Sequence, residues 1–131
     1  MKKIILVSIL LISGLSFADG NNDWQNIDQN VIKLNALNSC QGCVLRNTSF
    51  IGADLNNASL SGVDFISANL SSANLDNANL EGSSLFGADM NGTSLENANL
   101  FGSNLFAVNL SGANLTGANL IEADLSLANL S

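Results

Sequence analysis

From residue 45 to residue 130, every fifth position of this chain is apolar. Leu fills most of these positions and Phe or Met fills the others, over eighteen consecutive matches. Two residues before each lies a small side chain, usually Ala as at Ala53 and Ala58, and the residue between is commonly Asn, Asp or Ser. A period of five makes no face on a helix of 3.6 residues per turn. The pattern therefore predicts a repeating structure that is not an α-helix.

The inward positions alternate in spacing between two and three residues. Side chains two apart share one face of an extended strand, so the small and the large residue of each unit both point inward. The three-residue gap must then contain a corner. Gly and Asn are frequent in these gaps, as at Gly52, Asn57 and Gly82, and both tolerate turn dihedrals. We expect an all-β coil of short strands and corners.

These A-(N/D)-L-x-x units resemble the repeats of pentapeptide repeat proteins, over residues 43–131. The resemblance implies a right-handed quadrilateral β-helix, a solenoid with four units in each coil. Within this sequence, Asn57, Asn77 and Asn97 recur at intervals of twenty, which independently favours four units per coil. Eighteen units then make about 4.5 coils.

The N-terminal residues 1–18 have the pattern of a secretory signal. Lys2 and Lys3 form a basic start, an apolar run follows from Ile4 to Leu15, and cleavage is expected after Ala18. The run is shorter than the ~20 residues of a spanning helix. We therefore predict an exported protein, periplasmic or secreted, with no membrane anchor after signal cleavage.

Residues 19–42 are predicted to form a linker and a capping helix. Ile27, Val31 and Leu34 recur at helical spacing, which indicates a short amphipathic helix over about Ile27 to Leu37. Such a helix would cover the N-terminal end of the stack, where a solenoid exposes core side chains and unpaired backbone groups.

Cys40 and Cys43 form a C-x-x-C pair just before the repeats. A zinc site needs four ligands, and the chain has no His and no other Cys. A thioredoxin-like redox pair needs a βα context that the pattern does not predict. Both cysteines fall at inward positions, which favours a structural role, and a disulfide between them would be permitted in an exported protein.

The composition argues against several classes of function. A formal charge of −7 opposes contact with the phosphates of nucleic acid. The chain has no His, its cysteines are predicted to be inward, and no cleft is predicted that would gather its carboxylates. We expect no enzyme activity, cofactor, metal or small-molecule substrate. The expected partner is another protein, basic if it is charged.

The outward positions differ from one side of the predicted coil to the other. Ile66, Phe86 and Phe106 share one column, Phe101 and Ile121 share the adjoining one, and together they predict a contiguous apolar strip round one corner. Such a patch is typical of a contact surface, although stacked aromatic side chains can also serve the stability of the sheet itself. The opposite side is polar and acidic. It comprises Asn56, Asp76, Glu96 and Thr116 beside Asn57, Asn77 and Asn97.

The last coil carries a second cluster of apolar side chains: Leu120, Leu125, Leu127 and Leu130. Terminal units of a solenoid need a cover. These residues therefore predict end-to-end homodimerisation.

Taken together, these features predict a non-enzymatic, exported scaffold or protein-interaction module that presents a rigid β-helix surface. The resemblance implies an alternative, because some pentapeptide repeat proteins mimic DNA and inhibit or protect DNA gyrase. This sequence departs from that pattern in its export signal, in lacking the C-terminal dimerisation helix and projecting loops, and in spreading its acids round the coil.

Overall fold

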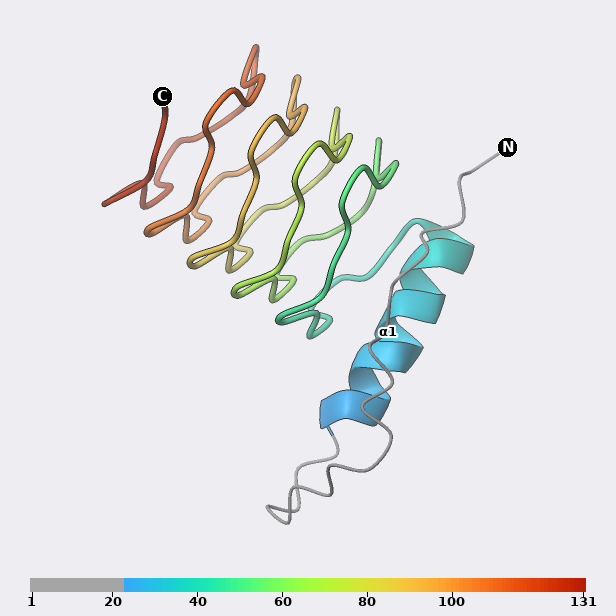
Figure 1. Ribbon diagram of the computed structural model, residues 1–131. Helices are drawn as coiled ribbons and strands as arrows, with labels where there is room; N and C mark the ends of the chain where they lie inside the picture. The colour runs from blue at the N-terminus through green and yellow to red at the C-terminus, as the bar shows by residue number, and fades with distance from the viewer. Residues whose placement is uncertain (1–22) are drawn as a thin grey trace.

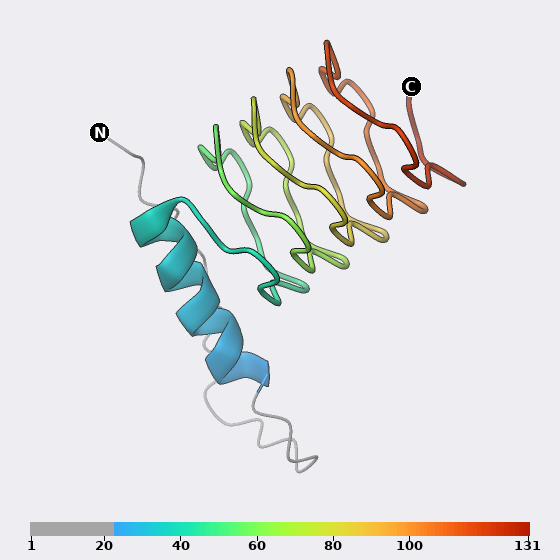
Figure 2. The same ribbon diagram turned by 180° about the vertical axis from the view of Figure 1, so that it is seen from behind.

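The computed structural model describes residues 23–131 as one helix followed by a stack of coils. Helix α1 (Asp23–Leu37) lies at one end of the stack, and the coils follow one another toward the C-terminus (Figures 1 and 2). The predicted signal segment, residues 1–18, lies outside the described residues. Among residues 23–131, no helix has the length and apolar character needed to cross a membrane.

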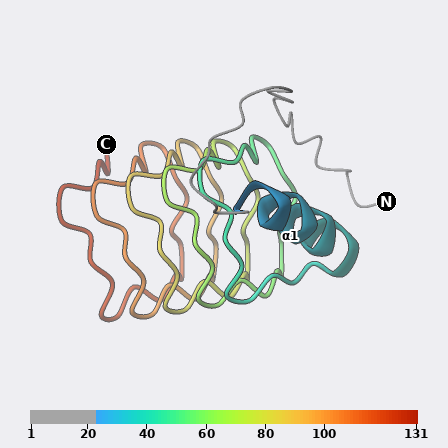
Figure 3. The same cartoon turned by 90° about the horizontal axis from the view of Figure 1, so that it is seen from below.

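Parallel pairing of single residues joins each coil to the next. Each paired residue meets the one twenty positions later, from Ser39 with Ser59 to Asn109 with Asn129. Neighbouring coils lie side by side along the stack (Figure 3). At the bridge between Val44 and Asp64, for example, the Leu45 N–H donates to the Asp64 carbonyl at 2.7 Å. The predicted coil of twenty residues is confirmed.

The corners are closed by backbone hydrogen bonds. The Ala53 N–H, for example, donates to the Phe50 carbonyl at 3.0 Å across the corner. The residue before Ala53 is Gly52, with a φ of 64°, and a left-handed residue at this place is what a type II turn requires. Asn or Asp side chains support many corners, since their Oδ1 accepts the N–H two residues on. The need for a left-handed residue explains why Gly and Asn are common at the last position of a corner.

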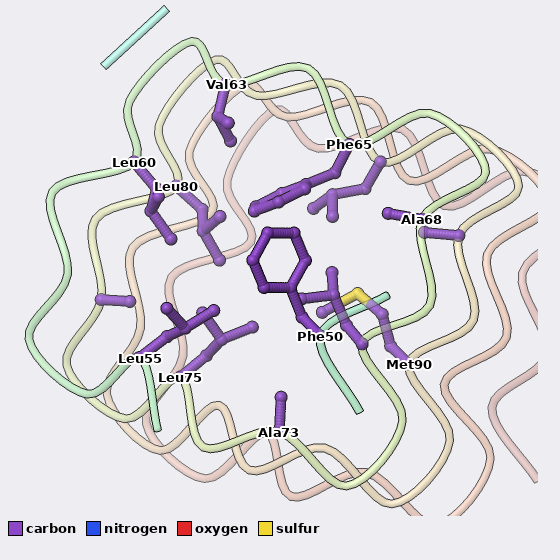
Figure 4. Packing of buried hydrophobic residues seen from close by; sticks show 14 of the residues in the cluster. Phe50, Leu55, Leu60, Val63, Phe65, Ala68, Ala73, Leu75, Leu80 and Met90 are labelled. Carbon is purple, nitrogen blue, oxygen red and sulfur yellow. The ribbon is translucent and has the colours of Figure 1, made fainter. Parts of the chain in front are cut away.

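The core runs through the middle of the coils. The central and small residues of each unit are buried from the first coil up to Leu110. Leu55 and Leu75 pack in one column, and Phe50 meets Phe65 edge to face with ring centroids 5.5 Å apart (Figure 4). Complete burial of such a side chain contributes about 1.5–3 kcal/mol before the cost of ordering it.

Helix α1 covers the N-terminal end of this core, as predicted. Val31 and Leu34 are buried in the same cluster as the coil residues. The Asn30 amide donates to the Val44 carbonyl at 3.0 Å. The helix ends where Asn38 adopts a φ of 50° and its N–H donates to the Leu34 carbonyl, a common helix terminus.

Two boundaries differ from those predicted. Helix α1 begins at Asp23 rather than Ile27, because the spacing of apolar residues does not fix the first residue of a helix. The stack begins at Ser39 rather than Cys43, since Cys40 takes a central position and its N–H donates to the Ser59 carbonyl at 2.9 Å. A buried Cys thus replaces the Leu by which the repeat was recognised.

Candidate interaction surface

Large apolar side chains point outward mainly on two consecutive corners of the coil. We call the first the Phe101 corner and the second the Phe106 corner, and we call both corners, with the strand residues between them, the apolar face. The Phe101 corner comprises residues 41–42, 61–62, 81–82, 101–102 and 121–122. The Phe106 corner comprises residues 46–47, 66–67, 86–87, 106–107 and 126–127.

The Phe106 corner carries a stack of aromatic rings. Phe86 and Phe106 lie parallel, with an interplanar angle of 2° and ring centroids 5.4 Å apart. Phe86 is 43% exposed, while Phe106 and Ile66 are half-buried in the same column. Leu127, which is 77% exposed, belongs to this corner too, one coil above Ala107. Leu127 was not predicted to lie on this corner, although it follows Ala107 by twenty residues, the length of one coil.

The Phe101 corner carries Phe101, half-buried, and Ile121, 65% exposed one coil above it. Asn104 stands on the strand between Phe101 and Phe106. The apolar residues therefore flank a narrow polar strip, and the expectation of one continuous strip round a single corner is wrong. The reason is geometric: each step of five residues passes a corner, so adjoining columns lie on different corners.

The apolar face also holds the most strained corner residues. Every corner from Gly42 to Leu127 ends in a residue of positive φ, and most of these are Gly, Asn or Ser. The exceptions are Ala107, Glu122 and Leu127, with φ of 54°, 61° and 60°. A left-handed conformation costs such residues roughly 1–2 kcal/mol. All three lie on the Phe101 or Phe106 corner, and strain kept in this way is a feature of functional sites.

Carboxylates border the aromatic residues along the stack. Asp64 and Glu81 lie in coils below the one that holds Phe101 and Phe106, and Glu122 and Asp124 lie in the coil above. Asp64 accepts a hydrogen bond from the Arg46 Nε at 2.6 Å.

Asp124 is hydrogen-bonded to Ser126, the second residue after it. Hydrogen bonds from the side chain and the backbone N–H of Ser126 hold the pKa of Asp124 below its ordinary value. Asp124 is therefore ionised at neutral pH.

The opposite side of the coil is polar, as predicted. Asp76 accepts the Glu96 N–H at 2.9 Å and also the Ser94 hydroxyl. Asn97 lies against Gly117, where an added Cβ would fall 2.3 Å from the Asn97 Oδ1. The stacked residues on this side are Asn56, Asp76, Glu96 and Thr116 in one column and Asn57, Asn77 and Asn97 in the next. Asp76 thus forms hydrogen bonds with the next coil, and Asn97 packs against Gly117 of the next coil.

Cys40 and Cys43 are joined by a disulfide that encloses the first corner. Both are buried beneath α1, at 0% and 6% exposure. Among the residues whose positions are described, no three His, Cys, Asp or Glu side chains gather closely enough to hold a metal ion.

The C-terminal coil brings together three of the four Leu residues predicted for an end contact. Leu120 and Leu125 point into the last coil and are half-buried, and Leu130 is 59% exposed. Their backbone N–H groups, which in lower coils donate to the next coil, have no partner within residues 23–131. Leu127 lies apart from them on the Phe106 corner.

Comparison with known proteins identifies the family. The model of pentapeptide repeats matches residues 39–65, 64–102 and 98–131, in eight copies. The chain belongs to the pentapeptide repeat family. No curated protein matches its sequence.

Solved pentapeptide repeat proteins have the same fold. One from the cyanobacterium Cyanothece 51142 aligns with a TM-score of 0.68 and 22% identity, over 80% of this chain and 99% of its own. One from Nostoc Pcc 7120 gives 0.57 and 33%, over 67% and 84%. One from the Arabidopsis thaliana thylakoid lumen gives 0.54 and 30%, over 63% and 54%. The fold is thus the right-handed quadrilateral β-helix that the repeats predicted.

Proposed function

We propose that this pentapeptide repeat protein is a non-enzymatic, exported interaction module that binds another protein through the apolar face. One observation carries the proposal. Of the seven large apolar side chains that are exposed in the described residues, three lie on this face: Phe86, Ile121 and Leu127. Patches of this kind mark protein contacts more often than isolated exposed residues do.

The rigidity of the face favours binding. Its aromatic residues stand on a backbone that pairs with the coils above and below. Pairing on both sides fixes the spacing of the side chains, so little conformational entropy is lost when a partner docks. The stacking of Phe86 on Phe106 also contributes to the fold, and the test must separate the two roles.

The test is partner capture with a triple variant. Phe86→Asn, Phe101→Asn and Phe106→Asn together should abolish binding of proteins captured from an envelope fraction, while circular dichroism shows an unchanged coil. Ile51→Asn is the matched control, because Ile51 is 62% exposed on a corner outside the apolar face. Equal capture by the wild type and by the folded triple variant would refute the proposed function.

Export is the second part of the proposal, and the pattern of residues 1–18 supports it. Edman sequencing of the protein recovered from the cell envelope or medium should begin at Asp19. Recovery of intact Met1 in the cytoplasm would refute export.

We also infer an end-to-end homodimer through Leu120, Leu125 and Leu130. Helix α1 covers the N-terminal end of the stack, which favours a two-fold contact between C-terminal coils over head-to-tail stacking of coils. Sedimentation should give a dimer mass that falls to the monomer on dilution, and a monomer mass at all concentrations would contradict it.

The gyrase alternative has no specific observation in its favour. A DNA mimic needs ordered acidic columns, whereas here the carboxylates lie on several sides, including Asp54, Asp89 and Asp124 on three different strand faces. A supercoiling assay should show no effect of the purified protein on gyrase.

A further inference from the structure

The charges around the apolar face restrict what can dock there. Four carboxylates, from Asp64, Glu81, Glu122 and Asp124, lie in the coils below and above the coil of Phe101 and Phe106. Arg46 is the one cation among the residues of the face, and it is paired with Asp64. The aromatic centre therefore lies between two acidic borders.

This arrangement disfavours several occupants. On this face, a second copy would bring the same acidic borders to the contact, so like charges would oppose each other. Nucleic acid and anionic membrane surfaces are repelled for the same reason. A segment with apolar side chains between Lys or Arg residues matches the face in both polarity and charge.

The strained residues independently mark the same borders. Glu122 and Leu127 adopt left-handed conformations where most corners have Gly or Asn. Both side chains are exposed to solvent. Packing in the core therefore does not explain why Glu and Leu stand at these positions. Glu122 adds a charge and Leu127 adds apolar area to the apolar face.

We propose that the apolar face is the docking site for a cationic amphipathic segment of a partner protein, with its apolar side chains on Phe86, Phe101 and Phe106 and its Lys or Arg residues on the acidic borders. This inference deepens the proposed function and rests on it. It names the chemistry of the partner that the face selects.

Titration with three synthetic heptapeptides tests this. The first has two lysines, then leucine, phenylalanine and leucine, then two lysines. The second replaces the lysines by glutamates, and the third replaces the three apolar residues by serines. Amide chemical shifts of the purified protein are expected to change at the apolar face with the first peptide only. At an ionic strength of about 1 M, where the Debye length falls to about 3 Å, this binding should weaken about tenfold or more.

Charge variants give the matched comparison. Glu81→Gln, Glu122→Gln and Asp124→Asn together should weaken binding of the first peptide about tenfold, as expected for three exposed charge pairs. Asp54→Asn, Asp76→Asn and Glu96→Gln remove the same number of charges outside the apolar face and should leave binding unchanged. Leu127→Gly should weaken it severalfold without loss of fold.

The outcomes separate the two proposals. If the second or third peptide binds as well as the first, or if both sets of charge variants behave alike, the inference is overturned. If the Phe triple variant still loses its captured partner in that case, the proposed function stands. If no peptide shifts the face and capture is also unchanged, both are overturned.

Discussion

Truncation of Leu75 to Ala measures how much the buried Leu side chains contribute to the free energy of unfolding. Leu75 is fully buried in mid-stack, between Leu55 in the coil below and Leu95 in the coil above. Leu→Ala at such a site removes the transfer free energy of the side chain and leaves a cavity, at a cost of about 2–5 kcal/mol. Backbone pairing on both sides restrains collapse of the cavity, because the Leu75 N–H is bonded to the Ser94 carbonyl at 2.7 Å.

The cost should depend on position in the stack. Leu125 points inward in the last coil but is only half-buried, so Leu125→Ala should cost about 1 kcal/mol. For a domain of this size, about 4 °C of melting temperature corresponds to 1 kcal/mol. Leu75→Ala should therefore lower the melting temperature by roughly 8–20 °C and Leu125→Ala by about 4 °C.

Differential scanning calorimetry and urea unfolding followed by circular dichroism measure both variants. The order of the two losses is the critical result. A Leu75→Ala protein that melts with the wild type, or no earlier than Leu125→Ala, would refute the inward ladder as the main source of stability.

Further variants test three local features of the structure. Within residues 23–131 the buried hydroxyl of Ser83 has no hydrogen-bond partner, whereas that of Ser103 donates to the Leu100 carbonyl. Ser83→Ala should therefore raise the free energy of unfolding by about 1 kcal/mol and Ser103→Ala should not, as measured by urea titration. Leu127→Gly should stabilise the fold by about 1 kcal/mol by relieving the left-handed strain, and a lower melting temperature would contradict this. The depressed pKa of Asp124 means that its contribution is present above the unfolded pKa and is lost as pH falls through the folded one. Asp124→Asn should therefore lose less stability than the wild type between about pH 5 and pH 2, and an equal loss in both proteins would contradict the assignment.

Most of the fold could be predicted because inward positions recur without interruption. Phe50, Leu75 and Met90 all lie where the five-residue period places them, and all are buried. The interval between Asn57 and Asn77 predicts the coil length because residues twenty apart lie in the same column of the stack.

The boundaries could not be predicted in this way. Cys40 fills a central position without being a Leu, and its role depends on backbone pairing with Ser59. Helix α1 begins at Asp23, four residues before the predicted start at Ile27, because the spacing of apolar residues indicates that a helix is present but does not fix its first residue.

The candidate site was only partly predictable for a different reason. Outward residues follow no period of their own, so Ile66, Phe86 and Phe106 could be aligned only once the coil length was assumed. The separation of Phe101 from Phe106 depends on where the chain turns. The strain at Ala107 and Leu127 depends on φ, which side-chain types alone do not reveal.

Site-specific photo-crosslinking tests whether a partner protein binds the apolar face. A photoreactive phenylalanine analogue replaces Phe86 on the apolar face or, in a control, Glu96 on the opposite side, and the cells are irradiated. If a partner binds the apolar face, position 86 gives a discrete covalent adduct and position 96 gives none. Adducts from position 96 alone, or equal labelling from both, would contradict the assignment of binding to the apolar face.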